Sequence, residues 1–330
     1  MTNTKKNVAI VCGGNSKEYD ISIQSGRVVL EHLSKDKYNS FLMVVRGTDW
    51  KVLLEDGRHL EVDKNDFSVR LHNEPLHFDV VFNAIHGSPG EDGKLLGYLE
   101  MLQIPYTGSN HIVSALTFNK NFCKQVVESA DVVALAKGVM LKKGQSFDLD
   151  ALLEHLGLPV FVKPNSNGSS VGVTKVKHKE ELLPAIQNAF NEDDEVLIES
   201  FIQGREMGCG VFEFKGKKLV FPITEIISKK EFFDYEAKYT TGMSDEITPA
   251  DVDEEADFNM KAIASELYSH LGCSGIVRFD FILTDDNIYF LEVNTVPGMS
   301  AASIVPQQAQ VMGFSLEQLF DMAIENVLTV

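Results

Sequence analysis

The stretch from Gly275 to Ser300 constrains the fold of this chain more than any other, because two alternating segments flank a turn-prone Thr-Asp-Asp-Asn. Alternation over Val277–Leu283 and Ile288–Asn294 predicts two antiparallel strands joined as a hairpin. With the turn centred on Asp286, the expected cross-strand pairs are Arg278 with Asn294, Asp280 with Glu292, and Ile282 with Phe290. The residues expected on the core face are Val277, Phe279, Phe281, Leu283, Tyr289, Leu291 and Val293.

The other face of this hairpin carries charges that a purely structural hairpin does not need. Two carboxylates directly across a strand pair lie roughly 5 Å apart and repel each other unless a positive group lies between them. Hard cations such as Mg²⁺ bind oxygen, and Asp280, Glu292 and Asn294 offer three such ligands, with phosphate oxygens to complete the shell. Arg278 is expected as a salt-bridge partner of the two carboxylates. The alternative is a solvated polar end of the hairpin, which the apolar neighbours in sequence disfavour.

Length and composition limit the class of protein. The chain has 330 residues, more than one hydrophobic core usually organises, so two or three domains are expected. Its net charge of -18 disfavours a broad nucleic-acid surface, which needs clustered Lys and Arg. The first apolar run is too short for a signal peptide, and no run reaches the ~18 apolar residues of a membrane span. With four scattered cysteines, we expect a cytoplasmic location and neither a nucleic-acid nor a membrane partner.

The first hundred residues have the pattern of a parallel α/β domain. A β-rich run at Asn7–Cys12 ends in two glycines and is followed by a predicted helix over 22–33, an arrangement that can bind an anion at the helix start. The third glycine of a dinucleotide fingerprint is missing, which disfavours a Rossmann dehydrogenase. Further strands are predicted at 41–45 and 80–84. The second leads into a loop carrying His86, either a ligand contact at a strand end or a loop cap.

The middle of the chain combines lysines with a small polar loop. One helix is predicted over 109–129, carrying Lys120 and Lys124. Strands at 138–141 and 160–162 precede Lys163 and a glycine-containing loop over 164–173, whose backbone N–H groups could contact phosphate. It is not a Walker A loop, and a plain hairpin loop is the alternative. Other helices are predicted at 93–103, 149–156, 180–191, 256–271 and 316–328, and a strand at 196–198. The aperiodic stretch 232–244 is expected to be a functional lid.

Several motifs occur in an order that resembles one known family. They are GGNSKEYDIS, HGSPGEDG, FNK, VKPNSNGSSVGV, ESFIQGRE, DYEAKY, RFDF and LEVNTVPGMSAASIVP. In these motifs and their order, the chain is similar to the D-alanine:D-alanine ligases of the ATP-grasp superfamily. The resemblance implies a three-domain α/β fold, α+β in its ATP-binding part. It places an N-terminal substrate domain at 1–109, a central ATP-grasp domain at 110–200 and a C-terminal one at 201–330.

The resemblance also implies a nucleotide and metal site. Lys120, Lys163 and Ser170 would contact the ATP phosphates. The adenine would be read by the Glu199 side chain and by the backbone of Ser200, Phe201 and Ile202, and Glu206 would hold the ribose. Asp280, Glu292 and Asn294 would bind two Mg²⁺ ions, for which Mn²⁺ can substitute.

The implied reaction joins two D-alanines through a D-alanyl phosphate, giving D-alanyl-D-alanine, ADP and phosphate for peptidoglycan synthesis. Arg278 and the Gly298 amide would stabilise the tetrahedral oxyanion. Glu18 would bind the first substrate's ammonium, with His86 nearby. Lys238, Ser303 and the Ile304 amide would bind the second substrate's carboxylate. Ser169 and Tyr239 would join Glu18 in a network that closes the lid.

Alternatives to this activity keep the fold. Tyr239 favours a D-alanine acceptor, while a D-lactate or D-serine ligase and a non-catalytic nucleotide sensor are the other possibilities. A homodimer is implied by the resemblance alone. The departures from the family pattern, which concern packing and the lid and remove no proposed catalytic group, are Leu96, Phe233, Phe279 and Ala302.

Overall fold

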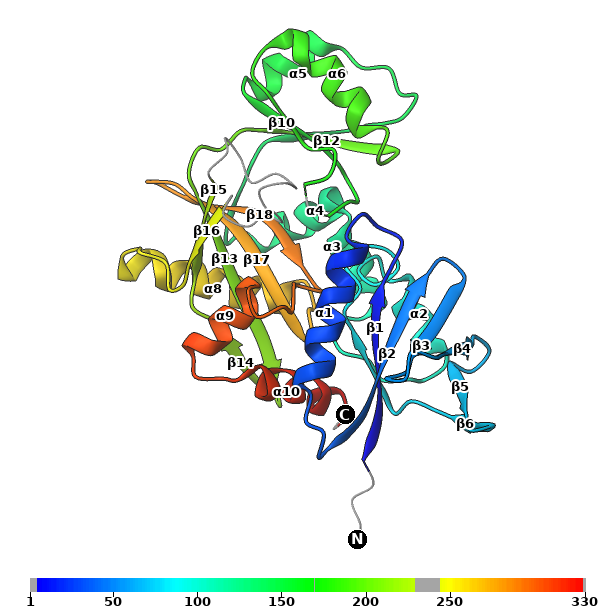
Figure 1. Ribbon diagram of the computed structural model, residues 1–330. Coiled ribbons are helices and arrows are strands. Elements are labelled where there is room, and N and C mark those ends of the chain that lie inside the picture. The colour runs from blue at the N-terminus through cyan, green and yellow to red at the C-terminus, as the bar shows by residue number, and fades with distance from the viewer. Residues whose placement is uncertain (1–4, 169, 229–243, 329–330) are drawn as a thin grey trace.

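The computed structural model describes residues 5–168, 170–228 and 244–328, which form three β-sheets with helices on their faces (Figure 1). The first sheet has the strand order β6-β5-β4-β3-β2-β1-β7. Its parallel part consists of β1 (Lys6–Gly13), β2 (Tyr38–Arg46) and β7 (Val80–Asn83), as the sequence predicts. The antiparallel extension, which the sequence does not predict, is β3 (Asp49–Leu53), β4 (His59–Asp63), β5 (Ser68–Leu71) and β6 (Glu74–Leu76).

The helices of this first unit are α1 (Tyr19–His32) and α2 (Lys94–Met101). Strand β1 is buried from Val8 to Gly13, as expected of a parallel strand covered on both faces. Its carboxyl end and the start of α1 face the loop after β7. Loops from two neighbouring parallel strands therefore meet at one edge of the sheet, where α/β proteins bind ligands.

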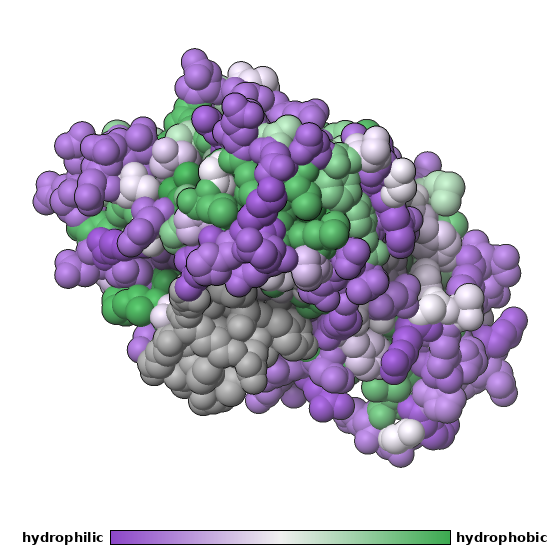
Figure 2. Space-filling view, turned by 90° about the horizontal axis from the view of Figure 1, so that it is seen from above, coloured by the Kyte–Doolittle hydropathy of each residue, from purple (hydrophilic) through white to green (hydrophobic). Residues whose placement is uncertain are grey.

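The second sheet is antiparallel, with the order β11-β10-β12-β9. Its strands are β9 (Gly138–Lys142), β10 (Val160–Pro164), β11 (Thr174–Val176) and β12 (Glu195–Ser200). Helices α5 (Leu149–Leu156) and α6 (Lys179–Ala189) cover one face and share a core of their own with it (Figure 1). Seen from the side of these helices, hydrophobic patches lie between hydrophilic side chains (Figure 2).

The third sheet has the order β16-β15-β13-β17-β18-β8, with β14 paired to β13. Its strands are β8 (Ala134–Leu135), β13 (Arg205–Phe214), β14 (Lys217–Val220), β15 (Thr224–Ser228), β16 (Ser244–Ile247), β17 (Ile276–Leu283) and β18 (Ile288–Asn294). Around it lie α3 (His111–Phe118), α4 (Lys120–Ala130), α8 (Glu254–His270), α9 (Ile304–Val311) and α10 (Leu316–Leu328). The sequence predicts neither α9 nor strands β13 to β15.

The predicted single helix over 109–129 is wrong. The structure has two helices, because Asn119 adopts an extended conformation (φ -83°, ψ 102°). Its side-chain oxygen accepts a hydrogen bond from the Phe122 N–H at 2.9 Å and so caps α4. The break places Lys120 at the first turn of α4, where its backbone N–H donates to the Asn165 carbonyl of the polar loop.

The hairpin of β17 and β18 is confirmed, but only part of its predicted register is. Arg278 pairs with Asn294 and Asp280 with Glu292 as expected. Beyond them the register shifts, so that Phe281 pairs with Phe290 and Ile282 with Tyr289, and the expected Ile282–Phe290 pair is wrong. Leu291 is the extra residue of this β-bulge.

The bulge exchanges the two faces of β18 at its outer end. Phe290 is 2% exposed and joins the core beside Phe281. Tyr289 and Leu291, predicted as core residues, instead line a cavity between the second and third sheets. The bulge thus supplies two apolar side chains to that cavity.

The first and third sheets share a hydrophobic core, while the second sheet has its own. Phe82 of β7 packs edge-on against Phe320 of α10 at 5.7 Å between ring centroids. Lys37 pairs with Asp321 of α10 at 2.9 Å. Helices α3 and α4 also pack with the third sheet rather than with the second. The boundaries at 110 and 201 stay a prediction.

Candidate active site

A cavity lies between the second and third sheets, and β10, β12 and β18, which contribute to its walls, are labelled in Figure 1. Its walls come from α4, the two central strands of the second sheet, the polar loop and the hairpin. The predicted site residues that line it are Lys120, Lys163, Ser170, Glu199, Ser200, Ile202, Glu206 and Glu292. The sequence motifs assigned to nucleotide binding therefore meet at one place.

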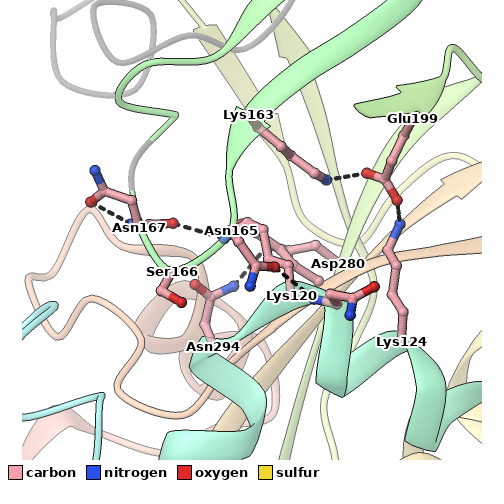
Figure 3. A network of polar contacts seen from close by, with 12 residues as sticks. Lys120, Lys124, Lys163, Asn165, Ser166, Asn167, Glu199, Asp280 and Asn294 are labelled. Atoms are coloured by element: carbon pink, nitrogen blue, oxygen red, sulfur yellow. Dashed lines mark hydrogen bonds and ion pairs between the residues drawn. The ribbon is translucent and has the colours of Figure 1, made fainter. Parts of the chain in front are cut away.

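Glu199, which lines this cavity, lies buried between two lysines (Figure 3). One carboxylate oxygen contacts Lys124 Nζ and the other contacts Lys163 Nζ. All three side chains are less than 10% exposed as residues. Burial lowers the pKa of Lys124 to about 8, an effect that the nearby positive charge of Lys120 reinforces and the negative charge of Glu292 opposes. The cluster carries more positive than negative charge when both lysines are protonated, which suits a polyanionic ligand.

The sequence gives Lys124 no role, although it lies one helical turn after Lys120 and so on the same face of α4. The contact of Glu199 with adenine stays a prediction, and the geometry adds that Glu199 would bind adenine and two lysines at once. Both of its oxygens already accept from lysines. A carboxylate has about four lone-pair sites, so a further donor can still be accommodated.

Nearby, the end of β12 and the residue that follows it make contacts of their own. The backbone N–H groups of Ser200 and Phe201 donate to Lys137 O and Pro159 O, at 2.9 and 3.0 Å. The Phe201 ring packs edge-on against Phe161 at 5.8 Å and lies 3.7 Å from Lys175 Nζ. Ser200 and Ile202 line the cavity, whereas the Phe201 ring forms part of the packing behind it.

Lys120 connects the polar loop to the hairpin. Its Nζ donates to the Asn167 carbonyl at 2.7 Å and lies 3.4 Å from Glu292 Oε2. The loop itself is held by Asn165, which is fully buried and donates to Glu195 Oε2 at 2.8 Å. One cation at the start of α4 therefore links the loop that follows β10 with the carboxylate of β18.

The polar face of the hairpin forms a compact charged cluster. Arg278 binds Asp280 through two hydrogen bonds, Nε to Oδ1 at 2.7 Å and Nη2 to Oδ2 at 2.8 Å. Asn294 Nδ2 also donates to Asp280 Oδ2, at 3.0 Å. Burial works against the charged guanidinium, but Asp280 and Glu292 raise the pKa of Arg278 overall. The expected salt bridge of Arg278 is confirmed for Asp280.

The donor set on this face suits a hard cation. Asp280 and Glu292 offer carboxylate oxygens, and Asn294 offers its amide oxygen. Asp280 and Glu292 are direct cross-strand neighbours. Within the residues that the structure describes, no group of three or more His, Cys, Asp and Glu side chains is arranged to hold a metal. Mg²⁺ prefers about six oxygen ligands, so these two carboxylates and the amide would share the ion with oxygens from outside the protein, such as those of phosphate.

Glu18 lies where the first sheet approaches the polar loop. It precedes α1 and is 7% exposed. A Cβ atom at Gly168 would lie 2.6 Å from Glu18 Oε2, so the Glu18 carboxylate would have to shift if a larger residue replaced this glycine. Glu18, a predicted substrate contact, and the loop after β10 are thus adjacent.

His86 is buried next to this carboxylate. Its Nδ1 donates to the Val296 carbonyl at 2.9 Å, so its Nε2 accepts from the Ser25 hydroxyl at 2.9 Å. Burial lowers the pKa of His86, partly opposed by Glu18. The neutral imidazole joins α1, the loop after β7 and the segment after β18 in one network. Ser25, which the sequence does not predict, is its partner on α1.

Glu91 is a second carboxylate of this region that the sequence gives no role. Its Oε2 accepts from the Gly87 N–H at 2.6 Å. Burial and the neighbouring Glu18 raise the pKa of Glu91 to about 8. A carboxyl with this pKa is mostly protonated at pH 7, which limits the repulsion between the two carboxylates.

The turn after the hairpin brings the other predicted substrate residues together. Ser303 precedes the first residue of α9, Ile304, whose N–H points out of the helix start. The Ser303 hydroxyl lies 2.8 Å from that of Ser300. A Cβ atom at Gly298 would lie 2.7 Å from Ser303 Oγ, so Gly298 and Ser303 are in close contact. Three predicted site residues, Ser169, Lys238 and Tyr239, lie outside the described residues, as does Phe233.

Two family models match the chain. One is described as D-ala D-ala ligase N-terminus and matches residues 7–109. The other is described as D-ala D-ala ligase C-terminus and matches residues 126–325. The chain belongs to the D-alanine–D-alanine ligase family. Members of this family are ATP-dependent ligases that act on small molecules, and the resemblance found in the sequence is confirmed.

Relatives within the ligase family match over nearly the whole chain. A D-alanine–D-alanine ligase of Bacteroides fragilis is 43% identical over 323 residues, covering 98% of this chain and 99% of the relative. One of Christiangramia forsetii is 45% identical over 324 residues, covering 98% and 99%.

Solved structures of the family confirm the α/β ATP-grasp fold. D-alanyl-alanine synthetase A from Vibrio cholerae superposes with a TM-score of 0.89 at 28% identity, covering 99% of each chain. The VanG D-Ala:D-Ser ligase of Enterococcus faecalis superposes with a TM-score of 0.87 at 33% identity, covering 98% of this chain and 100% of that one. In this chain, no helix within the described ranges is long and apolar enough to span a bilayer.

Proposed function

We propose that this protein joins two D-alanines at the expense of ATP and so supplies D-alanyl-D-alanine for peptidoglycan. The observation that carries the proposal is the position of Lys120, between Asn167 of the polar loop and Glu292 of the hairpin. It brings a nucleotide cavity and a carboxylate patch to one point. Membership of the ligase family and the names of relatives that match over 98% of the chain support the same activity.

For the phosphoryl transfer step, the lysines are the proposed phosphate contacts. Lys120 and Lys163, with Ser170 in the loop, face the cavity in which the triphosphate would lie. Glu199, Ser200, Phe201 and Ile202 would flank the adenine, and Glu206 the ribose. The first D-alanine's carboxylate would then receive the γ-phosphoryl group. Positive charge around the transferred group stabilises its transition state.

Asp280, Glu292 and Asn294 would hold the two Mg²⁺ ions, with Mn²⁺ as a substitute. Bound there, the ions would neutralise charge on the phosphates. Two observations support this assignment: Asp280 and Glu292 are cross-strand neighbours, and Glu292 lies close to Lys120. Asp280 also keeps Arg278 in a fixed orientation through two hydrogen bonds.

The second step needs a site for the attacking amine. Glu18 would bind the first D-alanine's ammonium, with His86 close by. Arg278 and the Gly298 amide would stabilise the oxyanion formed when the second amine attacks the acyl phosphate. Ser303 and the Ile304 N–H, with Lys238, would bind the second carboxylate, and Ser169 and Tyr239 would close the network with Glu18.

The acceptor is proposed to be D-alanine because Tyr239 is present. The similarity to a D-Ala:D-Ser ligase shows that this fold accommodates a different acceptor. A D-serine or D-lactate acceptor is therefore the second candidate. We also propose the three domains given above, a homodimer and a cytoplasmic location.

The test is incubation of the purified protein with ATP, Mg²⁺ and D-alanine, followed by measurement of phosphate and dipeptide. We expect both products in equal amounts. ATP binding without phosphate release would refute the ligase and favour a nucleotide sensor. Release that requires added D-serine or D-lactate would refute the acceptor. A Glu266→Ala variant, changed at an exposed carboxylate of α8, serves as the control and should match wild type.

A further inference from the structure

Two consecutive glutamines fasten the first turn of α9 to the third sheet. Gln308 is fully buried. Its Nε2 donates to the Gly208 carbonyl at 2.9 Å and to Thr224 Oγ1 at 3.0 Å, and its Oε1 accepts from the Gly210 N–H at 3.0 Å. These three bonds fix α9 against β13 and β15.

Gln307 makes a different connection. Its Nε2 donates to the Ala302 carbonyl at 2.7 Å and to Glu246 Oε2 at 3.1 Å. Ala302 immediately precedes Ser303 and Ile304, and Glu246 lies on the edge strand β16. One amide group therefore links a carboxylate of the sheet edge with the turn that carries the proposed site for the second substrate's carboxylate.

Glu246 also faces the charged centre of the site. Arg278 experiences the charges of Asp280, Glu292 and Glu246. Burial raises the pKa of Glu246, while Arg278 and the hydrogen bond from Gln307 act in the opposite direction. A carboxylate that serves only to hold an edge strand does not need a place beside this guanidinium.

We propose that Glu246, acting through Gln307, is a positioning residue for the second substrate. By accepting the Gln307 hydrogen bond, it holds the Ala302 carbonyl and thereby the Ser303 hydroxyl and Ile304 N–H that would bind the carboxylate of an amino-acid acceptor. This inference rests on the proposed function.

The position predicts effects confined to the second half of the reaction. Glu246→Ala and Gln307→Ala remove the same connection from opposite ends. Each should raise the KM for the second D-alanine about fivefold, the net scale of one lost hydrogen bond of ordinary strength. The KM for ATP and the first half-reaction, followed as D-alanine-dependent positional isotope exchange in ATP, should not change.

Three further variants make the test specific. Glu246→Gln keeps an oxygen that can accept from Gln307 and should restore most of the affinity for the second D-alanine. The double variant Glu246→Ala/Gln307→Ala should be no worse than either single variant, because both act through one contact. Glu266→Ala controls for loss of a carboxylate and should match wild type in every measurement.

The outcomes separate this inference from the proposed function. No dipeptide from the wild-type protein refutes the function itself and this role with it. Wild-type turnover with unchanged second-substrate KM in both alanine variants refutes the role of Glu246 alone. A parallel rise of all KM values together with a lower Tm shows a purely structural contact, and also refutes it.

Discussion

Two charge clusters adjoin the cavity, and they are built with opposite balances. In the second sheet and α4, one carboxylate, Glu199, is shared by Lys124 and Lys163. On the hairpin, Arg278 is surrounded by the carboxylates Asp280, Glu292 and Glu246. The first cluster is suited to receive a polyanion and the second to receive cations. Because buried ion pairs contribute little net stability, the imbalance is better explained by the ligands than by folding.

The largest expected effect tests the cation side of this comparison. Glu292→Gln keeps the size of the side chain and removes its charge, so we expect turnover to fall at least tenfold, or ~1.4 kcal/mol of barrier. Steady-state phosphate release at saturating ATP and D-alanine measures it, with Glu266→Gln as the exposed control. Near-normal turnover at saturating Mg²⁺ would remove Glu292 from the metal site and with it the contrast between the clusters.

A smaller effect is expected on the anion side. Lys163→Met should weaken ADP binding about fivefold, ~1 kcal/mol, while leaving the binding of adenosine unchanged. The matched variant Lys124→Met removes the other lysine that contacts Glu199. It should weaken the binding of ADP and of adenosine by similar factors, each smaller than the loss of ADP binding in Lys163→Met. Calorimetric titration of both ligands decides between the two lysines. Equal losses for ADP and adenosine in Lys163→Met would show that Lys163 does not contact phosphate.

The hairpin shows how far the sequence could predict this site. Its turn and the Asp280–Glu292 pair follow from alternation and a polar turn. The bulge does not, because residues 288–291 are all apolar and a two-residue period cannot show which of them face the core. The predicted core positions of Tyr289 and Leu291 are wrong for that reason, although Phe279, Phe281 and Val293 are buried as expected.

Partners that come from distant segments were beyond sequence reasoning. Lys163 and Glu199 meet because β10 pairs with β12, and Lys124 reaches Glu199 from α4, which packs with the third sheet. The break at Asn119 had a local signal, since Asn is a preferred N-cap residue, but an apolar pattern on both sides of it favoured one helix. The sequence alone allows His86 to be either a ligand contact or a loop cap. The structure shows a bridge between α1 and the segment after β18.

The smallest effect concerns this neutral network, which holds the same site together without charge. Because the pKa of His86 in the folded protein lies below its ordinary value near 6.5, the folded state resists protonation while the unfolded state does not. The neutral His86 therefore contributes its full stability above about pH 6.5, and this contribution is lost as the pH falls below that value. Wild type should lose roughly 0.5–1 kcal/mol more unfolding free energy between pH 7 and pH 5.5 than His86→Gln, whose amide does not titrate. Urea unfolding of both proteins at the two pH values measures the difference, and His77→Gln, at an exposed histidine, should retain the wild-type pH dependence. An identical pH dependence in wild type and His86→Gln would mean that His86 titrates normally. His86 would then become positively charged on acidification, and the region around it would be a third charged cluster rather than a neutral network.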